Sequence, residues 1–371
     1  MRLYKPGSLG QRRWKNFRSN RRAFWSLWVF SILFFTCLFA ELVANDKPLL
    51  ASYRSEIYFP AFSFYPETIF GGDFETEAEY PAPEVQCLIV SGGLQSCLDD
   101  PEDVMLDAAD GIVDGEEIDK GWIIWAPVPY SFNTINYDVQ PAPGAPDSKH
   151  WLGTDDQTRD VVARIIYGFR ISTLFALAVV VTSTIVGIAA GGAMGYYGGW
   201  VDLVFQRLVE IWSNIPSLYV IIIASAVFTM TFNKLMLIIV AFSWISLVGV
   251  VRAEFLRARN LEYVRAARAL GVGDTTIMFR HILPNAMVAT LTFLPFIITG
   301  TISTLTGLDF LGFGLPPSYP SLGELALQAK NNLQAPWLAF AAFTTFAVML
   351  SLLVFVFEGV RDAFDPRKTF E

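Results

Sequence analysis

Charged residues are scarce in this chain of 371 residues: Asp, Glu, Lys and Arg make up 17% of it, whereas a soluble domain carries about 25%. Histidine is rarer still, with two residues, which excludes a metal site built from a histidine cluster. The three cysteines are too few for a disulfide-built mini-protein. There is no Gly-Lys dipeptide, so the phosphate-binding loop of ATPases is absent. An ordinary soluble enzyme is therefore excluded, and hydrophobic residues, at 53%, dominate instead.

Six apolar stretches are long enough to cross a membrane, which takes about 20 residues. They run over Phe24–Val43, Ile171–Met194, Leu208–Met230, Leu235–Val251, Ala286–Thr306 and Trp337–Phe357. None has an ionisable residue at its middle, whereas ion-driven carriers generally place such groups inside the membrane. We expect an all-α polytopic membrane protein of six spans that another subunit drives. A secondary carrier and a membrane-anchored scaffold that binds proteins remain as alternatives.

The two signs of charge are separated along the chain. Residues 1–22 hold eight Lys/Arg and no acid, while residues 45–160 hold 23 of the 35 acidic residues. Because Lys and Arg favour the cytoplasmic side, both termini are expected in the cytoplasm, and the acidity disfavours nucleic acid as a partner. We expect the chain to begin with a basic N-terminus 1–23, a first span 24–44 and a periplasmic subdomain 45–160. A core 161–357 follows, with five spans and a cytoplasmic loop at 252–284, and then a cytoplasmic C-terminus 358–371.

The segment 45–160 is too long to be a simple connector. Its aromatic and proline-rich patches predict a small subdomain of mixed or irregular structure with short strands. Cys87 and Cys97 lie in it, in a compartment that permits disulfides. Two readings stay open for this pair: a bridge that closes the intervening loop, or two free thiols.

Glycine and proline inside the apolar stretches predict how these helices pack and bend. Gly187, Gly191, Gly195 and Gly199 recur every four residues, so on one helix they share a face that a neighbouring backbone can approach closely. Pro216 and Pro295 lack a backbone N–H and predict kinks in the third and fifth stretches. We interpret the glycine face as helix packing rather than as part of a pathway.

The loop between the fourth and fifth stretches predicts two short helices. A basic helix over 254–270 is expected to end at Gly271, which suits the left-handed C-terminal position. Asp274 can then cap a second helix, Thr275–Leu283, which Pro284 is expected to stop. Together they would form a rigid knob at the membrane face, and the alternative is a merely solvated basic loop.

Six residues of this loop carry a family resemblance: Arg265, Ala266, Ala267, Gly271, Leu283 and Pro284. In the order Ala-Ala-x3-Gly followed by Leu-Pro, they resemble the EAA loop of binding-protein-dependent ABC importer permeases. Two positions depart from that pattern, since Arg265 replaces the usual Glu and His281 the usual Ile. The resemblance implies the type I importer permease fold and a loop that docks on a separate ATPase. ATP and Mg would be bound by that ATPase, with no cofactor or metal in this chain.

A second signature precedes the second span and consists of Gly153, Thr154, Asp155, Arg159, Asp160, Arg164, Gly168 and Arg170. It is similar to the signature of the C-type dipeptide and oligopeptide permeases, as is the loop Asp309–Pro317. Four further stretches, Ala44–Leu50, Phe70–Gly72, Trp122–Pro127 and Asn331–Trp337, resemble the Yej-type permeases, which are linked to microcin C and peptide uptake. Relative to that subfamily, the acidic stretch 84–119 is an insertion.

The resemblance implies a set of partners. These would be a second homologous permease, a cytoplasmic ABC ATPase, a periplasmic solute-binding protein, membrane lipid and a peptide substrate. The implied location is the bacterial inner membrane, which the chain would cross several times. The sequence alone identifies neither the peptide nor the residues that line its path.

Overall fold

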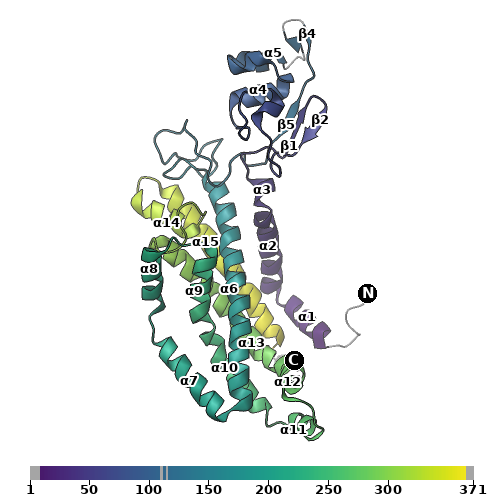
Figure 1. Ribbon diagram of the computed structural model, residues 1–371, viewed down its shortest axis with the longest axis vertical. Helices are drawn as coiled ribbons and strands as arrows, with labels where there is room; N and C mark the ends of the chain where they lie inside the picture. The colour runs from purple at the N-terminus through teal and green to yellow at the C-terminus, as the bar shows by residue number, and fades with distance from the viewer. Residues whose placement is uncertain (1–8, 109–111, 114–115, 365–371) are drawn as a thin grey trace. The chain divides into compact units, whose positions relative to one another are not determined.

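The computed structural model describes residues 9–108, 112–113 and 116–364. The chain divides into two compact units, each formed by segments that are distant in sequence. Unit 1 consists of the described parts of Met1–Phe34, Ile171–Leu327 and Ala342–Glu371, and unit 2 of Phe35–Arg170 and Gln328–Ala341. The ribbon in Figure 1 carries the element labels used below.

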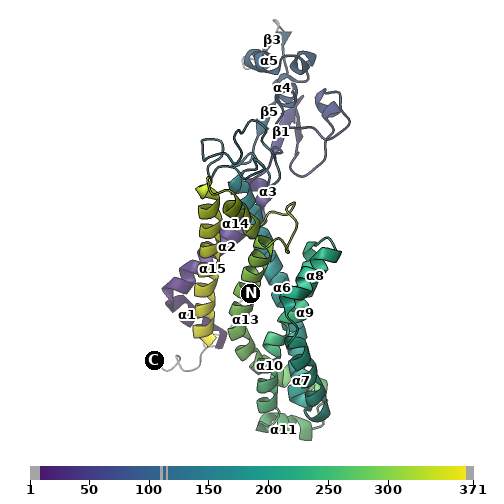
Figure 2. The same cartoon turned by 90° about the vertical axis from the view of Figure 1, so that its left-hand side faces the viewer.

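Unit 1 is built from helices. They are α1 (Leu9–Ser19), α2 (Arg21–Leu38), α6 (Val161–Tyr197), α7 (Gly199–Ser213), α8 (Ser217–Val227), α9 (Phe232–Ser243), α10 (Ile245–Ala258), α11 (Glu262–Ala269), α12 (Asp274–Thr276), a π-helix (Ile277–Ile282), α13 (Leu283–Phe310), α14 (Leu322–Asn331) and α15 (Pro336–Phe364). The last residues of α2, the first turns of α6 and α15 and the end of α14 belong to unit 2. Helices α10 and α13 lie side by side in both ribbon views (Figures 1 and 2).

The expected spans are present as helices, but two of them are broken. Within the described residues, four helices are long and apolar enough to cross a membrane: Arg21–Leu38, Val161–Tyr197, Asp274–Phe310 and Pro336–Phe364. Two further pairs pass the same test only when each pair is taken together: α7 with α8, bent by 66°, and α9 with α10, bent by 40°. The apolar helices therefore amount to four spans, or up to six if each bent pair is one span.

The first break agrees with the kink expected at Pro216, and the second was not predicted. No break accompanies Pro295, which lies inside α13. Pro216 lies directly before α8, where its missing N–H costs no helical hydrogen bond. At the second break, the indole N–H groups of Trp212 and Trp244 both donate to the carbonyl oxygen of Ala241, over 2.7 and 2.8 Å. Ser243 donates to the carbonyl of Ile239 over 2.8 Å. Side-chain donors on helical carbonyls bend a helix, so the prediction of one unbroken helix over 235–251 is wrong.

Three of the four glycines in the expected packing face lie against α10. A Cβ atom would come within 2.9 Å of Leu247 at Gly187, within 2.7 Å of a backbone oxygen at Gly191 and within 2.6 Å of Phe255 at Gly195. Gly199 does not share this role. It begins α7 with a φ of 54°, and no atom would lie within 4 Å of its Cβ. The helix ends at Tyr197, so the four-residue period does not reach Gly199.

Unit 2 combines short strands and short helices, as expected for 45–160. Its elements are α3 (Ala40–Val43), β1 (Leu50–Tyr53), β2 (Glu56–Tyr58), η1 (Glu67–Phe70), α4 (Pro83–Ser91), η2 (Gln95–Leu98), α5 (Pro101–Ala108), β3 (Ile112–Val113), β4 (Glu116–Glu117) and β5 (Trp122–Ile124). Strand β1 is the centre of an antiparallel sheet of order β2-β1-β5, with Ala51 opposite both Tyr58 and Ile123.

The core of unit 2 is aromatic and is closed by a disulfide. The ring of Phe70 lies 5.5 Å from that of Tyr53 and 6.0 Å from that of Tyr80. A disulfide joins Cys87 in α4 to Cys97 in η2, and both residues are fully buried. The free-thiol alternative therefore does not describe this structure.

Candidate functional site

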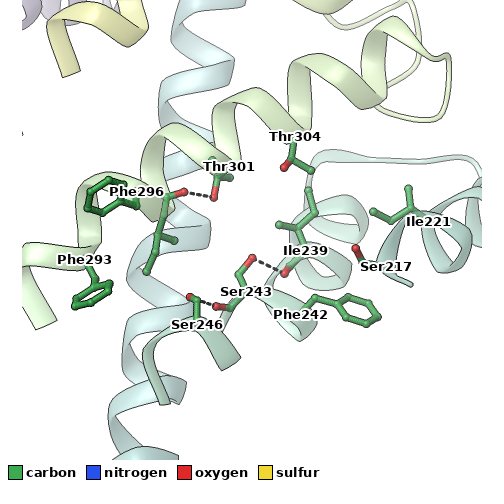
Figure 3. A pocket seen from close by; sticks show the side chains of 12 residues that line it. Ser217, Ile221, Ile239, Phe242, Ser243, Ser246, Phe293, Phe296, Thr301 and Thr304 are labelled. Carbon is green, nitrogen blue, oxygen red and sulfur yellow. Dashed lines mark hydrogen bonds between the residues drawn. The ribbon is translucent and has the colours of Figure 1, made fainter. Parts of the chain in front are cut away.

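A cavity of about 350 Å³ lies among α8, α9, α10 and α13 of unit 1 (Figure 3). Its lining combines apolar side chains with small hydroxyl groups. The lining residues are Ser217, Ile221, Ile239, Phe242, Ser243, Ser246, Phe293, Phe296, Ile297, Gly300, Thr301 and Thr304. None of them is charged, and none was predicted from the sequence. The sequence feature that could have indicated these lining residues is the presence of small polar residues inside otherwise apolar stretches.

Three hydroxyl groups of the cavity, on Ser243, Ser246 and Thr301, donate to backbone carbonyls three or four residues earlier in the chain. Ser246 donates to the carbonyl of Ser243 over 2.6 Å, and Thr301 to that of Ile297 over 2.7 Å. A hydroxyl that has donated its proton keeps its lone pairs free to accept. Phe293 and Phe296 add exposed aromatic surface, at 42% and 65% exposure. The cavity can thus accept hydrogen bonds from N–H groups and contact apolar groups, without a fixed charge.

A second, separate cavity of unit 1, also of about 350 Å³, lies among α10, α13 and α15 and is charged. It is lined by Glu254, Arg257, Asn285, Val288, Ala289, Thr292, Arg361 and Phe364. On α10, Ser246 of the first cavity and Glu254 and Arg257 of the second follow one another at helical spacing, so they share a face. Arg257 donates to Glu254 over 2.6 Å. One surface of unit 1 therefore changes from neutral to charged along α10.

The basic helix expected over 254–270 is broken in two, because α10 ends at Ala258, α11 begins at Glu262, and the extended backbone of Leu261 separates them. The expected second helix does not form as predicted either. Helix α11 ends at Ala269, and Gly271 has a φ of 79°, in agreement with the left-handed turn predicted there. The chain then enters α12 at Asp274 and continues through the π-helix directly into α13. The prediction that a separate helix Thr275–Leu283 stops at Pro284 is wrong.

The π-helix accounts for the continuity at Pro284. A proline inside an α-helix clashes with the carbonyl four residues earlier and leaves it without a donor. The wider turn of Ile277–Ile282 precedes Pro284, which occupies the first turn of α13, where a proline is tolerated. Short π-helical segments occur frequently at functional sites. Leu283 and Pro284 thus mark a change of helix type and not a helix end.

Asp274 does not cap a helix with its side chain but holds the loop to α6. The hydroxyl of Tyr196 donates to the Asp274 carboxylate, and Arg268 donates to the same hydroxyl over 3.1 Å. That hydrogen bond raises the pKa of Arg268 above its ordinary value. Arg259 donates to the carbonyls of Gly195 and Tyr196 over 3.3 Å. The end of α6 is therefore a fixed support for the loop.

The loop has a buried side and an exposed side. Val264 and Ala267 are buried with Phe255 and Ile277, so Ala267 is a packing residue and is not available to a partner. Arg265 and Ala266 are exposed. The exposed side also carries Leu270 and Phe279, at 83% and 66% exposure, which the sequence did not single out. Apolar side chains so exposed beside basic ones are typical of a protein contact.

In unit 2, the signature before the second span gathers around the fully buried carboxylate of Asp155. Arg159 donates to Asp155 Oδ2 over 2.7 Å, Gln328 donates to the same oxygen over 3.4 Å, and the guanidinium of Arg164 lies 3.7 Å away. The other oxygen accepts the backbone N–H of Arg159 over 2.9 Å. Asp155, Arg159 and Arg164 are at most 4% exposed. Buried charges need such partners, so these signature residues form a structural core.

The rest of the signature extends that core. Asp160 contacts the Nδ1 atom of His150 over 2.9 Å, and both are buried. Thr154 donates its backbone N–H to Gly144 over 2.9 Å, and Gly153 has a φ of 72°.

The last two signature residues lie on α6. Gly168 is buried. Arg170 donates to both carboxylate oxygens of Glu41 over 2.8 and 2.9 Å and lies 4.7 Å from the ring centre of Tyr167. Tyr167 in turn donates to the carbonyl of Ala44 over 2.9 Å. The signature therefore fixes α6 to the end of the first span within unit 2.

Within the part of the chain that the structure describes, no three His, Cys, Asp or Glu side chains are placed to hold a metal ion. Of the acidic stretch 84–119, Asp110 and Asp114 lie outside the described residues. The helix α4 and the disulfide lie inside it.

Residues 183–370 match the family described as "Binding-protein-dependent transport system inner membrane component", and residues 8–61 match "N-terminal TM domain of oligopeptide transport permease C". The chain belongs to the first of these families. The matched region contains both cavities and the whole loop between α10 and α13. The expected resemblance to oligopeptide-type ABC permeases is confirmed, and the permease is a transport subunit rather than an enzyme.

Two relatives match the permease over nearly its whole length, and a third matches about two thirds of it. It is 53% identical to the "Peptidoglycan transport system permease protein YejE" of Agrobacterium fabrum, over 97% of this chain and 93% of that protein. It is 51% identical to the "Inner membrane ABC transporter permease protein YejE" of Escherichia coli, over 97% and 98%. The "Oligopeptide transport system permease protein OppC" of Bacillus subtilis is 31% identical, over 64% and 78%.

Proposed function

We propose that this permease forms one half of the membrane path of an ABC importer for peptides or peptide-like compounds. The observation that carries the proposal is the uncharged cavity among α8, α9, α10 and α13, with a second, charged cavity further along α10 and α13. A path that must also release its cargo benefits from weak, dispersed contacts rather than a fixed charge. The names of the relatives, which refer to peptidoglycan and oligopeptides, support this class of cargo.

The cavity favours a peptide over an inorganic ion. A peptide backbone offers N–H donors and its side chains offer apolar surface, and the cavity presents hydroxyl oxygens beside Phe293 and Phe296. Microcin C-like compounds and peptides derived from peptidoglycan share that chemistry. A secondary carrier has less support, because no charged residue lines the first cavity.

The loop from 252 to 284 would couple this path to the ATPase. Arg265, Ala266, Leu270 and Phe279 form its exposed side, and Tyr196 fixes its position. Movement of a docked ATPase would be passed to α13, because no break separates α12 from α13. ATP and Mg would be bound by the ATPase and not by this chain.

The proposed arrangement follows from the charge pattern. Six spans would place both termini and the 252–284 loop in the cytoplasm, and would place 45–160 in the periplasm, where the disulfide of Cys87 and Cys97 can persist. A second homologous permease would complete the path, and a solute-binding protein would deliver the peptide. The bacterial inner membrane is the expected location.

Two measurements test this proposal: co-purification of the assembly, and peptide transport by the purified assembly. The permease is expected to co-purify with an ABC ATPase, and proteoliposomes that hold the full assembly and its binding protein should accumulate a labelled peptide only with ATP. Introducing charge into the cavity with Ser246→Asp should abolish uptake without preventing assembly. The exposed Ser213→Asp, outside the cavity, is the control. Uptake without an ATPase would instead support a secondary carrier.

A further inference from the structure

The first helix of unit 1 is basic on its exposed side. Between residues 9 and 22 there are six Lys/Arg and no acid. Arg12, Lys15, Arg18, Arg21 and Arg22 are all exposed. No ion pair joins any of them to another residue in the described ranges. This much unneutralised charge calls for an anionic partner.

The opposite side of α1 is fixed to the protein. Phe17 is buried with Ala23 and Ala363, and the guanidinium of Arg13 lies 4.3 Å from the ring centre of Phe364. A Cβ at Gly359 would lie 2.2 Å from Ala23, so α2 and α15 cross closely beside Phe17. The helix is therefore docked on the end of α15 and is not a free tail.

A sharp turn separates α1 from the apolar helix α2. Asn20 lies between the two helices, and its side chain accepts the backbone N–H of Ala23 over 3.3 Å, as an N-cap does. Because α2 is a candidate span, this turn places α1 at one surface of the membrane. Trp14, Trp25 and Trp28 surround the turn with 54%, 65% and 52% exposure.

From these features we infer that α1 and the first turn of α2 form a binding site for the headgroups of anionic phospholipids. Exposed tryptophans prefer the boundary between headgroups and acyl chains, and Lys and Arg beside them attract anionic lipid. Arg12 and Lys15 lie on the face of α1 opposite Phe17, so lipid can reach them while the helix stays docked. This inference does not depend on the identity of the transported compound.

Hydrogen exchange of the full-length chain in nanodiscs tests the site locally. Two kinds of disc are compared: phosphatidylglycerol mixed with phosphatidylcholine, and phosphatidylcholine alone. Exchange of amides 9–22 should be at least about fivefold slower in the mixed discs, because each cation near an anionic surface contributes about a fivefold change in affinity. The difference should vanish in Arg12→Gln/Lys15→Gln. It should persist in Arg12→Lys/Lys15→Arg, which keeps the charge, and in the control Lys120→Gln/Lys149→Gln, which removes two charges elsewhere.

Three results would overturn the inference. One is equal exchange in the two kinds of disc. Another is a lipid effect that survives in Arg12→Gln/Lys15→Gln. The third is slow exchange produced by inorganic phosphate in discs of phosphatidylcholine alone, because the anion would then not need to be a lipid.

Discussion

Gly195 of α6 and Phe255 of α10 lie so close together that a Cβ on Gly195 would come within 2.6 Å of the Phe255 Cβ. The same hypothetical atom would lie 2.5 Å from the carbonyl oxygen of Arg252. Neither neighbour can move independently, because one belongs to a helix backbone and the other is buried. The absence of a side chain at Gly195 thus sets the spacing of these two helices.

Gly195→Ala is expected to destabilise the permease by about 1–3 kcal/mol, as overpacking of a tight contact does. Gly249→Ala is the matched control. It lies inside α10, no atom lies within 4 Å of its added Cβ, and alanine favours helix by up to about 1 kcal/mol over glycine. The two substitutions should therefore shift the thermal unfolding temperature in detergent in opposite directions. Equal shifts would contradict the contact.

Gly271→Val is expected to block coupling while leaving insertion intact. The φ of 79° is poorly tolerated by a β-branched residue and costs on the order of 1–3 kcal/mol, enough to reorient α11. Transport and substrate-stimulated ATP hydrolysis should both collapse. Gly273→Val is the control, because Gly273 is similarly exposed but has a φ of −63°. Arg265→Ala should be milder, since an exposed charge pair contributes about 1 kcal/mol or less. Wild-type transport by Gly271→Val would remove the main support for the coupling role.

Tyr196→Phe is expected to loosen the coupling loop without unfolding the core. It removes the hydroxyl that joins Asp274 to Arg268, a loss of about 1–3 kcal/mol for hydrogen bonds to charged groups. Amides 262–276 should exchange faster, and ATP hydrolysis should respond less to substrate. The neighbouring Tyr197→Phe, at a residue that is 53% exposed, should leave both measurements unchanged.

The two cysteines of unit 2 should appear as one linked pair in non-reducing peptide mapping of the membrane-extracted protein. Replacing both, as Cys87→Ala/Cys97→Ala, should destabilise the region by about 2–4 kcal/mol, as the loss of a disulfide typically does. Limited proteolysis of 45–160 reports this change. Cys37→Ala, which removes a buried free cysteine, leaves that proteolysis pattern intact. Full alkylation of Cys87 and Cys97 without reductant would contradict the bridge.

Asp155→Asn should be severely destabilising, by about 3–5 kcal/mol, because the buried guanidinium groups of Arg159 and Arg164 would lose the negative charge of a carboxylate that both contact. Asp156→Asn changes the next residue, which is exposed, and should have little effect. The yield of folded protein in membranes distinguishes the two. Similar yields would show that the Asp155 carboxylate is not what holds this core together.

Local requirements explain which features the sequence predicts. The left-handed turn at Gly271 and the kink at Pro216 depend on the backbone of one residue, and both are present. The break at Trp244 depends on the indole of Trp212, which is 32 positions earlier in the chain, so no local pattern contains it.

Contacts between distant parts of the chain explain which features of the site the sequence does not predict. The signature residues before the second span could be named from resemblance, but Gln328, which donates to Asp155, lies 173 residues further along the chain. The lining of the first cavity depends on how α8, α9, α10 and α13 are rotated against one another, which apolar runs alone do not specify. The sequence also does not predict the burial of Ala267, because that burial follows from the packing of Val264, Phe255 and Ile277 around it.

The π-helical turn ahead of Pro284 has a mechanical consequence. Because it replaces a break, Asp274–Phe310 is one helical rod of 37 residues, with Pro295 inside it, about 55 Å long at 1.5 Å per residue. Asp274 stands at one end of this rod, where Tyr196 acts as a pivot, and Phe296 projects into the cavity about 33 Å further along. If this helix turned as one body about Tyr196, a small rotation would be amplified into a displacement of several ångströms at the cavity wall, as at the long arm of a lever.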